Sequence, residues 1–198
     1  MLNYKEADNF KFFADIKAAF PAKMFKNRPY EGNGGERLLF DAGRGSMQRL
    51  VQAGFPMNAV TKLFLTHLHS DHTVGLPDLW LTGWLFGRAR PLPLIGPAGT
   101  SQMAAHLTQA YAWDIATRSK DERLPSDGVR FEARDIAPGV VWDREGLKVT
   151  AFTVDHGEVA APALGYRVDY QGRSAVLSGD LRYDERILTH ARGVDVFV

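Results

Sequence analysis

The sequence predicts an α/β fold in which two β-sheets are covered by helices. Short apolar or alternating segments, typical of strands, recur through the chain, and segments with helical apolar spacing lie between them. Strands in two sets with helices between them favour two sheets over one. With 198 residues, 45% of them hydrophobic, the chain can form a substantial core. We therefore expect a single domain over residues 1–198.

Each expected element follows from a local pattern. Trp80 and Trp84, four residues apart, indicate one helix, and Gly54 marks the end of another. Apolar or alternating runs bounded by turn residues indicate the strands. The expected strands are 37–41, 60–66, 91–95, 129–135, 140–143, 148–154, 163–170, 174–178 and 194–198, and the expected helices are 46–53, 76–86, 102–111 and 185–191.

The remaining segments are assigned from their turn and capping residues. Residues 1–28, rich in Phe and Lys, are expected to form one or two helices. Thr100 or Ser101 is expected to cap the helix that follows. Residues 117–128 are polar and contain a proline and a glycine, so we expect a loop there. Gln171-Gly172 is expected to form a hairpin turn.

Composition excludes several classes of protein. The formal net charge of +1 gives no global indication of a nucleic-acid or membrane partner, although it leaves room for a local basic patch. The absence of cysteine excludes disulfides and thiolate metal sites. No apolar run reaches membrane-spanning length, and the first 28 residues do not resemble a signal peptide. We expect a cytoplasmic protein, with a periplasmic location as the alternative.

The main candidate site is the segment His67-Leu68-His69-Ser70-Asp71-His72, which holds four potential metal ligands in six residues. Zinc binds imidazole nitrogen and carboxylate oxygen, usually with four ligands. His67 and His69 are two residues apart after a predicted strand, so in extended backbone their side chains point to the same side and can share an ion. Asp71 and His72 follow where the chain turns towards a helix, and could face a second ion. The end of a buried strand is where ligands collect in α/β proteins.

Residues 66–72, Thr-His-Leu-His-Ser-Asp-His, resemble the metal-binding signature of metallo-β-lactamase superfamily hydrolases, and the similarity extends in order and spacing over residues 34–198. Within the superfamily the chain is most similar to the ribonuclease Z and arylsulfatase-like branch. The further matching segments are Leu39-Phe40-Asp41-Ala42-Gly43, Gly75-Leu76-Pro77, Asp155-His156-Gly157, Gly165-Tyr166-Arg167 and Ser178-Gly179-Asp180. The resemblance implies a four-layer αβ/βα sandwich and a dinuclear metal site.

Carried over residue by residue, the resemblance implies a set of six metal ligands. The first zinc ion would be held by His67, His69 and His156. The second would be held by Asp71 and His72, with Asp180 bridging the two ions. The expected cofactor is therefore two Zn²⁺ ions.

Three features depart from the pattern of the family. Residues 1–33 form an atypical N-terminal segment without the usual first strand and Gly-Thr-Gly turn. The family places another metal histidine beyond the final strand, whereas this chain ends at Val198; His190, in a predicted helix, is expected to be a surface residue instead. The long arm with which bacterial ribonuclease Z holds transfer RNA would lie between His156 and Asp180, where only 23 residues are present. These departures predict a fold truncated at both ends, with an incomplete second site and one ion as the alternative to two.

The resemblance implies a zinc-dependent hydrolase in which a metal-bound hydroxide attacks a phosphodiester or sulfate ester. Asp71 would act catalytically by orienting the nucleophile or moving its proton. One alternative is hydrolysis of a lactone, thioester or β-lactam; another is a non-catalytic metal-binding or assembly protein that keeps the fold. The expected partner is a small anionic ester, with nucleic acid as an alternative, and exposed sheet edges would favour a homodimer.

Two interpretations are possible for several residues around the motif. Asp41 could support a metal histidine or serve only as a turn residue. The stripe formed by Trp80, Trp84 and Phe86 could line a substrate pocket, although core packing is the commoner role. The arginines Arg44, Arg88 and Arg90 could meet an anionic substrate, although such residues are usually solvated surface.

Overall fold

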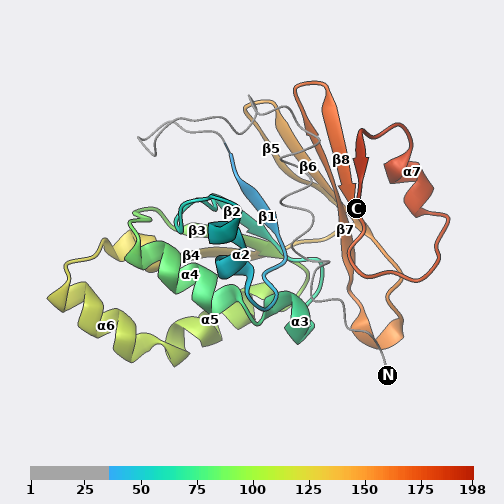
Figure 1. The fold of residues 1–198 in the computed structure, drawn as a ribbon. Helices are drawn as coiled ribbons and strands as arrows, with labels where there is room; N and C mark the ends of the chain where they lie inside the picture. Colours follow the sequence, from blue (N-terminus) through green and yellow to red (C-terminus); the bar gives the residue numbers. More distant parts are fainter. Residues whose placement is uncertain (1–35) are drawn as a thin grey trace. The chain divides into compact units, whose positions relative to one another are not determined.

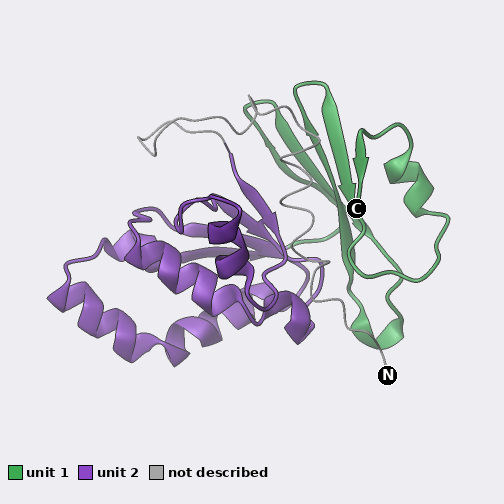
Figure 2. Cartoon of the chain, in the orientation of Figure 1, with its two compact units in different colours: residues 1–35, 136–198 green, residues 36–135 purple. Residues whose placement is uncertain are grey.

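The computed structural model describes residues 36–198, so the helices expected in residues 1–28 lie outside the described part. The described chain divides into two compact units, residues 36–135 and 136–198 (Figure 2). Each unit contains one β-sheet and its own helices (Figure 1). The expected α/β class with two sheets and helices is confirmed, whereas the single domain over the whole chain stays a prediction.

The unit of residues 36–135 is built on a parallel sheet of four strands in the order β1-β2-β3-β4. Parallel neighbours need crossover connections, and helices supply them here (Figure 1). The strands are β1 (Leu38–Phe40), β2 (Lys62–Phe64), β3 (Leu92–Gly96) and β4 (Phe131–Asp135). The helices are α2 (Ser46–Gln52), α3 (Ser70–Thr73), α4 (Leu76–Leu85), α5 (Thr100–Ala110) and α6 (Ala112–Asp121), with the 3₁₀ helix η1 (Ser126–Val129).

The core of this unit lies along the central strands and the inner face of α4. Every residue of β2 is buried, as expected for a parallel strand covered on both faces. Trp80 and Trp84 are fully buried, and their indole N–H groups donate to the carbonyls of Val129 and Pro125. Trp80 and Trp84 are therefore core residues rather than pocket lining. Phe86, which follows α4, is 58% exposed and therefore lies outside this core.

The loop expected at 117–128 is wrong for much of its length, because α6 continues to Asp121 and η1 begins at Ser126. No residue of α6 is buried. Its polar residues form ion pairs one helical turn apart, from Arg118 to Asp114 and to Glu122. The polarity that suggested a loop is therefore that of a solvated helix supported by side-chain pairs.

The expected cap of α5 by Thr100 or Ser101 is also wrong. Gly99 occupies the capping position, and the Thr100 hydroxyl donates to the carbonyl of Pro97 instead. The first turn is capped from β4, where the Asp135 carboxylate accepts the N–H groups of Ser101 at 2.7 Å and Gly99 at 3.0 Å. These hydrogen bonds hold the pKa of Asp135 below its usual value. The capping acceptor is thus 34 residues distant in sequence from Ser101.

Arg88 departs from the solvated surface expected for scattered arginines. It is only 4% exposed, and its guanidinium donates to the carbonyls of Trp80 and Gly128. This side chain satisfies buried carbonyl groups of α4 and η1, so it has a structural role. Arg44 and Arg90 are exposed, as expected.

The unit of residues 136–198 contains a sheet of five strands in the order β5-β6-β7-β8-β9. The first four pair antiparallel, and β9 pairs parallel with β8. Gln171 and Gly172 connect β7 to β8 with φ values of 48° and 75°, so the expected hairpin turn is confirmed. The elements are β5 (Gly139–Arg144), β6 (Leu147–Thr153), η2 (Glu158–Ala160), β7 (Leu164–Tyr170), β8 (Arg173–Leu177), α7 (Ile187–Ala191) and β9 (Val196–Phe197).

Helix α7 packs on this sheet through a small apolar cluster. Phe152 and Val176 are buried there, with Ile187 and Ala191 of α7 packed against them. His190 was expected on the surface, but it is partly buried, with its ring stacked on Phe152 at 4.0 Å between centroids and 6° between planes. Burial, and then the charge of Arg167, lower the pKa of His190 below its usual value.

Along residues 36–198, none of the helices combines the length and the apolar character that crossing a membrane requires.

The lowered pKa of His190 predicts a pH-dependent contribution to stability. As the pH falls below about 6.5, His190 takes up a proton in the unfolded chain before it does so in the folded one. The folded state therefore loses stability as the pH falls from about 6.5 towards the lower pKa that His190 has in the folded protein. We expect wild-type protein to lose stability relative to His190→Phe, which keeps the stacked ring, in urea unfolding between pH 7.5 and 5. A difference between the two proteins that does not change with pH would contradict this assignment.

Replacing the buried guanidinium of Arg88 should destabilise the unit of residues 36–135. In Arg88→Met the carbonyls of Trp80 and Gly128 lose a charged donor, at a cost of about 2–3 kcal/mol in the free energy of unfolding. The exposed Arg90→Met variant is the matched control and should change it by less than about 0.5 kcal/mol. Denaturant unfolding of both variants measures this, and equal effects would show that Arg88 is not structurally important.

Candidate metal centre

The sequence motif lies at the carboxyl ends of two adjacent parallel strands. Asp41 directly follows β1, and His67 follows β2 after Leu65 and Thr66. Carboxyl ends of parallel strands meet at one edge of a sheet, so two segments far apart in sequence come together. Asp41 has a φ of 61°, in the left-handed region that Asp tolerates better than most residues.

The Asp41 carboxylate accepts three hydrogen bonds from the segment after β2. Its oxygens lie 2.8 Å from the backbone nitrogen of Thr66, 2.9 Å from Thr66 Oγ1 and 2.7 Å from His72 Nδ1. Because a carboxylate can only accept, His72 Nδ1 carries the proton and Nε2 is the acceptor nitrogen of the ring. This is the arrangement in which a histidine presents Nε2 to a metal. Asp41 therefore supports a candidate ligand and is more than a turn residue.

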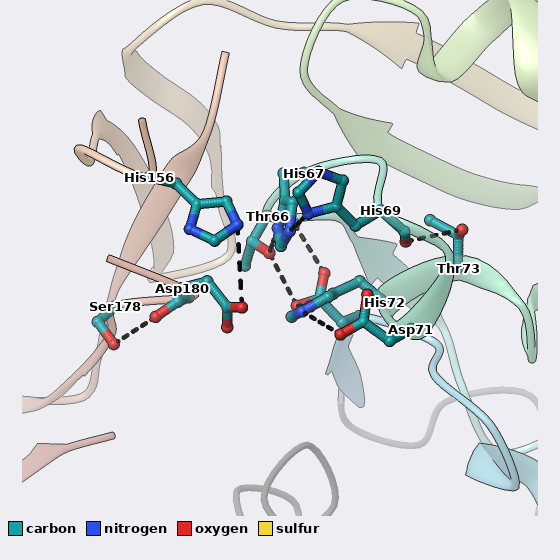
Figure 3. Close-up of polar contacts among 11 residues, drawn as sticks. Thr66, His67, His69, Asp71, His72, Thr73, His156, Ser178 and Asp180 are labelled. Carbon is teal, nitrogen blue, oxygen red and sulfur yellow. Dashed lines mark hydrogen bonds and ion pairs between the residues drawn. The ribbon is translucent and has the colours of Figure 1, made fainter. Parts of the chain in front are cut away.

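His67 and His69 approach each other through their ring nitrogens. His67 Nε2 lies 3.0 Å from His69 Nδ1, and the rings meet edge to face at 4.6 Å (Figure 3). Two ligand atoms of one tetrahedral zinc ion, each about 2.0–2.1 Å from the metal, lie about 3.3 Å apart. The spacing of these two nitrogens therefore fits a shared ion.

Asp71 and His72 belong to α3, the single helical turn that begins right after His69. Asp71 Oδ2 lies 3.6 Å from His72 Nε2, again close to the spacing of two ligands of one ion. His72 is 2% exposed, whereas the Asp71 side chain is 44% exposed. The carboxylate can thus meet solvent while the imidazole is fixed by Asp41.

The loop after β1 packs tightly against the motif. Ala42 N–H donates to the carbonyl of His72, and Gly75 N–H donates to the carbonyl of Ala42. A Cβ at Gly75 would lie 2.1 Å from the carbonyl oxygen of Gly43, so only glycine allows this approach. The match at Gly75 thus has a packing reason.

In residues 136–198, the predicted ligands His156 and Asp180 lie together in the loops that follow β6 and β8. His156 Nε2 is 4.0 Å from Asp180 Oδ2 (Figure 3). The two loops are joined by a hydrogen bond from the backbone nitrogen of Arg182 to the carbonyl of Asp155, at 2.7 Å. The Asp155 carboxylate also accepts the N–H of Gly157, which shapes the turn after His156.

The donor set fits a zinc site. The two units offer imidazole nitrogens and carboxylate oxygens, the ligands that zinc takes in proteins without cysteine. Four predicted ligands come together in residues 36–135 and two in residues 136–198, each set within its own unit. Sequence reasoning missed Thr66, whose side chain contacts both Asp41 and His67. Its only signal was a hydroxyl residue directly before the first histidine.

The family and several relatives of this chain are identifiable. A family model described as the β-lactamase superfamily domain matches residues 36–198. Ribonuclease Z of Mycolicibacterium gilvum is 37% identical over 150 residues, which cover 74% of this chain and 52% of the relative. Ribonuclease Z of Mycobacterium avium is 40% identical over 150 residues, which cover 74% and 53%. The chain thus spans about half the length of the curated relatives it matches.

The fold also resembles solved structures. The crystal structure of human tRNase Z, short form, matches with a TM-score of 0.66 and 22% identity, covering 84% of this chain and 68% of the other. At that identity the likeness supports the fold alone. Together with the family match over residues 36–198 and the histidine motif after β2, it shows that the chain belongs to the metallo-β-lactamase superfamily, whose members typically bind metal ions.

Proposed function

We propose that this protein is a zinc-dependent phosphodiesterase that acts on RNA. The observation that carries the proposal is the histidine cluster after β2, in which the Asp41 carboxylate holds His72 in the tautomer that metal binding requires. Superfamily membership makes a metal hydrolase the natural use of such a cluster. The name ribonuclease Z, shared by relatives 37–40% identical, favours an RNA phosphodiester over the small anionic ester expected from the sequence.

The proposed ligands are those inferred from the motif. We assign His67, His69 and His156 to the first ion. The 3.0 Å spacing of the His67 and His69 nitrogens supports their sharing it. Asp71 and His72 are assigned to the second ion, and Asp180 to both. The proposal requires that His156 and Asp180, in the loops after β6 and β8, bind the same ions as the ligands after β2.

Bound zinc would supply Lewis acidity, stabilising charge on the phosphoryl oxygens and lowering the pKa of water towards 7. The side chains of the protein would position the ligands and move protons. The Asp71 carboxylate, 44% exposed, would accept a proton from the attacking water at Oδ1, because Oδ2 is the oxygen that faces His72 and is assigned to the metal. Asp41 would keep the His72 ring from turning, because the Nδ1 proton is held at 2.7 Å. The phosphate itself would need a cation from the surface, and the exposed Arg44, three residues after Asp41, is one candidate.

Removing the Asp41 carboxylate should weaken metal binding. Asn at this position can keep some of the hydrogen bonds, but it cannot accept all three. We expect Asp41→Asn to lower the affinity for zinc about 10–100-fold, the range seen when a partner of a metal histidine is lost. Competition with a chromogenic chelator measures the affinity. The exposed Asp78→Asn on α4 is the matched control and should bind zinc like wild type; equal affinities for all three proteins would refute the role of Asp41.

A substrate panel tests the reaction class. We expect zinc-loaded protein to cleave a labelled RNA oligonucleotide, to lose the activity with a chelator and to regain it on addition of zinc. Asp71→Asn should lower kcat by about 10²–10⁴-fold, and the exposed His106→Ala should leave it unchanged. Cleavage of p-nitrophenyl sulfate or of a lactone, with RNA left intact, would replace the proposed function by one of the alternatives. Metal binding without any turnover would favour a non-catalytic protein.

A further inference from the structure

Thr66 lies between the carboxylate of Asp41 and the first histidine of the motif. Its Oγ1 is 2.9 Å from Asp41 Oδ2 and 3.0 Å from His67 Nδ1. Thr66 and His67 are labelled in Figure 3. The residue is 2% exposed, and its backbone nitrogen also donates to Asp41. The hydroxyl therefore has two polar neighbours in a site from which bulk water is excluded.

The direction of the protons in this contact follows from counting donors. A threonine hydroxyl has one hydrogen, and an ionised carboxylate can only accept. The hydrogen of Thr66 must therefore point to Asp41, because otherwise two acceptor oxygens would face each other at 2.9 Å in a buried site. Thr66 Oγ1 is then left to accept, and the His67 Nδ1 nitrogen that faces it must carry the donated proton.

We infer that Thr66 is a positioning residue that transmits the orienting effect of Asp41 to His67. The hydroxyl fixes His67 as the Nδ1-protonated tautomer, so that Nε2 is the ligand nitrogen. Asp41 thereby sets two histidines at once, His72 by direct contact and His67 through Thr66. In the ligand assignment given above these histidines belong to different ions. The inference therefore deepens the proposed metal site and rests on it, while the tautomer of His67 depends on the hydrogen bonds alone.

The hydrogen bond between His67 and His69 has the same donor-to-acceptor direction. With the proton of His67 on Nδ1, its Nε2 is an acceptor, and it lies 3.0 Å from His69 Nδ1. In the metal-free protein His69 then donates to His67, His67 to Thr66, and Thr66 to Asp41. A single anionic acceptor, Asp41, thus orders Thr66, His67 and His69 through one series of hydrogen bonds and His72 through another.

Two substitutions separate this role from simple packing. Thr66→Val keeps the shape of the side chain and removes the hydroxyl, whereas Thr66→Ser keeps the hydroxyl and removes a methyl group. Imidazole ¹⁵N shifts in the metal-free protein report the tautomer of His67, and chelator competition reports zinc affinity. We expect wild type and Thr66→Ser to show His67 protonated on Nδ1, and Thr66→Val to lose this preference and to bind zinc on the order of 10-fold more weakly.

The control for loss of a hydroxyl is Thr108→Val on α5, where the hydroxyl donates to the Ala104 carbonyl one helical turn earlier. It should leave both the tautomer and the affinity unchanged. A folded Thr66→Val protein with the wild-type tautomer and affinity would overturn the inference. Wild-type protein that binds no zinc would refute the proposed function, and the ¹⁵N shifts of the metal-free protein would still decide the role of Thr66. If Thr66→Val does not fold, loss of the tautomer in Thr66→Ala provides the same test.

Discussion

The hydrogen bonds accepted by Asp41 are the interaction on which the candidate centre depends. One carboxylate, buried at the end of β1, takes the backbone N–H and hydroxyl of Thr66 and the ring N–H of His72. The backbone nitrogen of Asp41 donates in turn to the carbonyl of Phe64. These contacts tie the end of β1 to the segment after β2 and to α3. A left-handed backbone at Asp41, which costs on the order of 1 kcal/mol, is tolerated where so many contacts fix it.

This arrangement shows why a short motif can act as a metal site only within its fold. His67 and His69 come from the extended chain after β2, and Asp71 and His72 come from one turn of helix. Extended and helical backbone direct side chains to different positions, which is why the proposed function assigns these residues to two ions. In the other unit, the loops after β6 and β8 bring one imidazole and one carboxylate together. Within each unit, hydrogen bonds hold the segments that carry the candidate ligands, from Asp41 to His72 in one and from Arg182 to Asp155 in the other.

The sequence predicted most of the elements and the residues of the cluster, because both leave dense local signals. Buried strands are apolar runs, and four ligands in six residues are hard to explain otherwise. The predictions that were wrong concern residues whose contacts are distant in sequence. The cap of α5 comes from Asp135, and the burial of Arg88 depends on η1. The role of Asp41 stayed undecided, because no local pattern shows that β1 and β2 are neighbours.

The loop predicted over part of helix α6 was wrong for a different reason. None of its residues is buried, and its second half, residues 117–121, is polar, so the part that was expected to be a loop has no apolar pattern that indicates a helix. Thr66 was overlooked because its importance lies in the direction of one hydroxyl hydrogen, which depends on a carboxylate 25 residues away.

The central proposal is that His156 binds the same zinc ion as His67 and His69. The most direct test is the number of zinc ions bound per chain, measured by elemental analysis of wild type beside His69→Ala and His156→Ala. The account predicts close to two ions in wild type and a clear loss in both variants, because each removes a ligand of the first ion. Full zinc content in His156→Ala, with loss only in His69→Ala, would contradict it and confine the metal to residues 36–135.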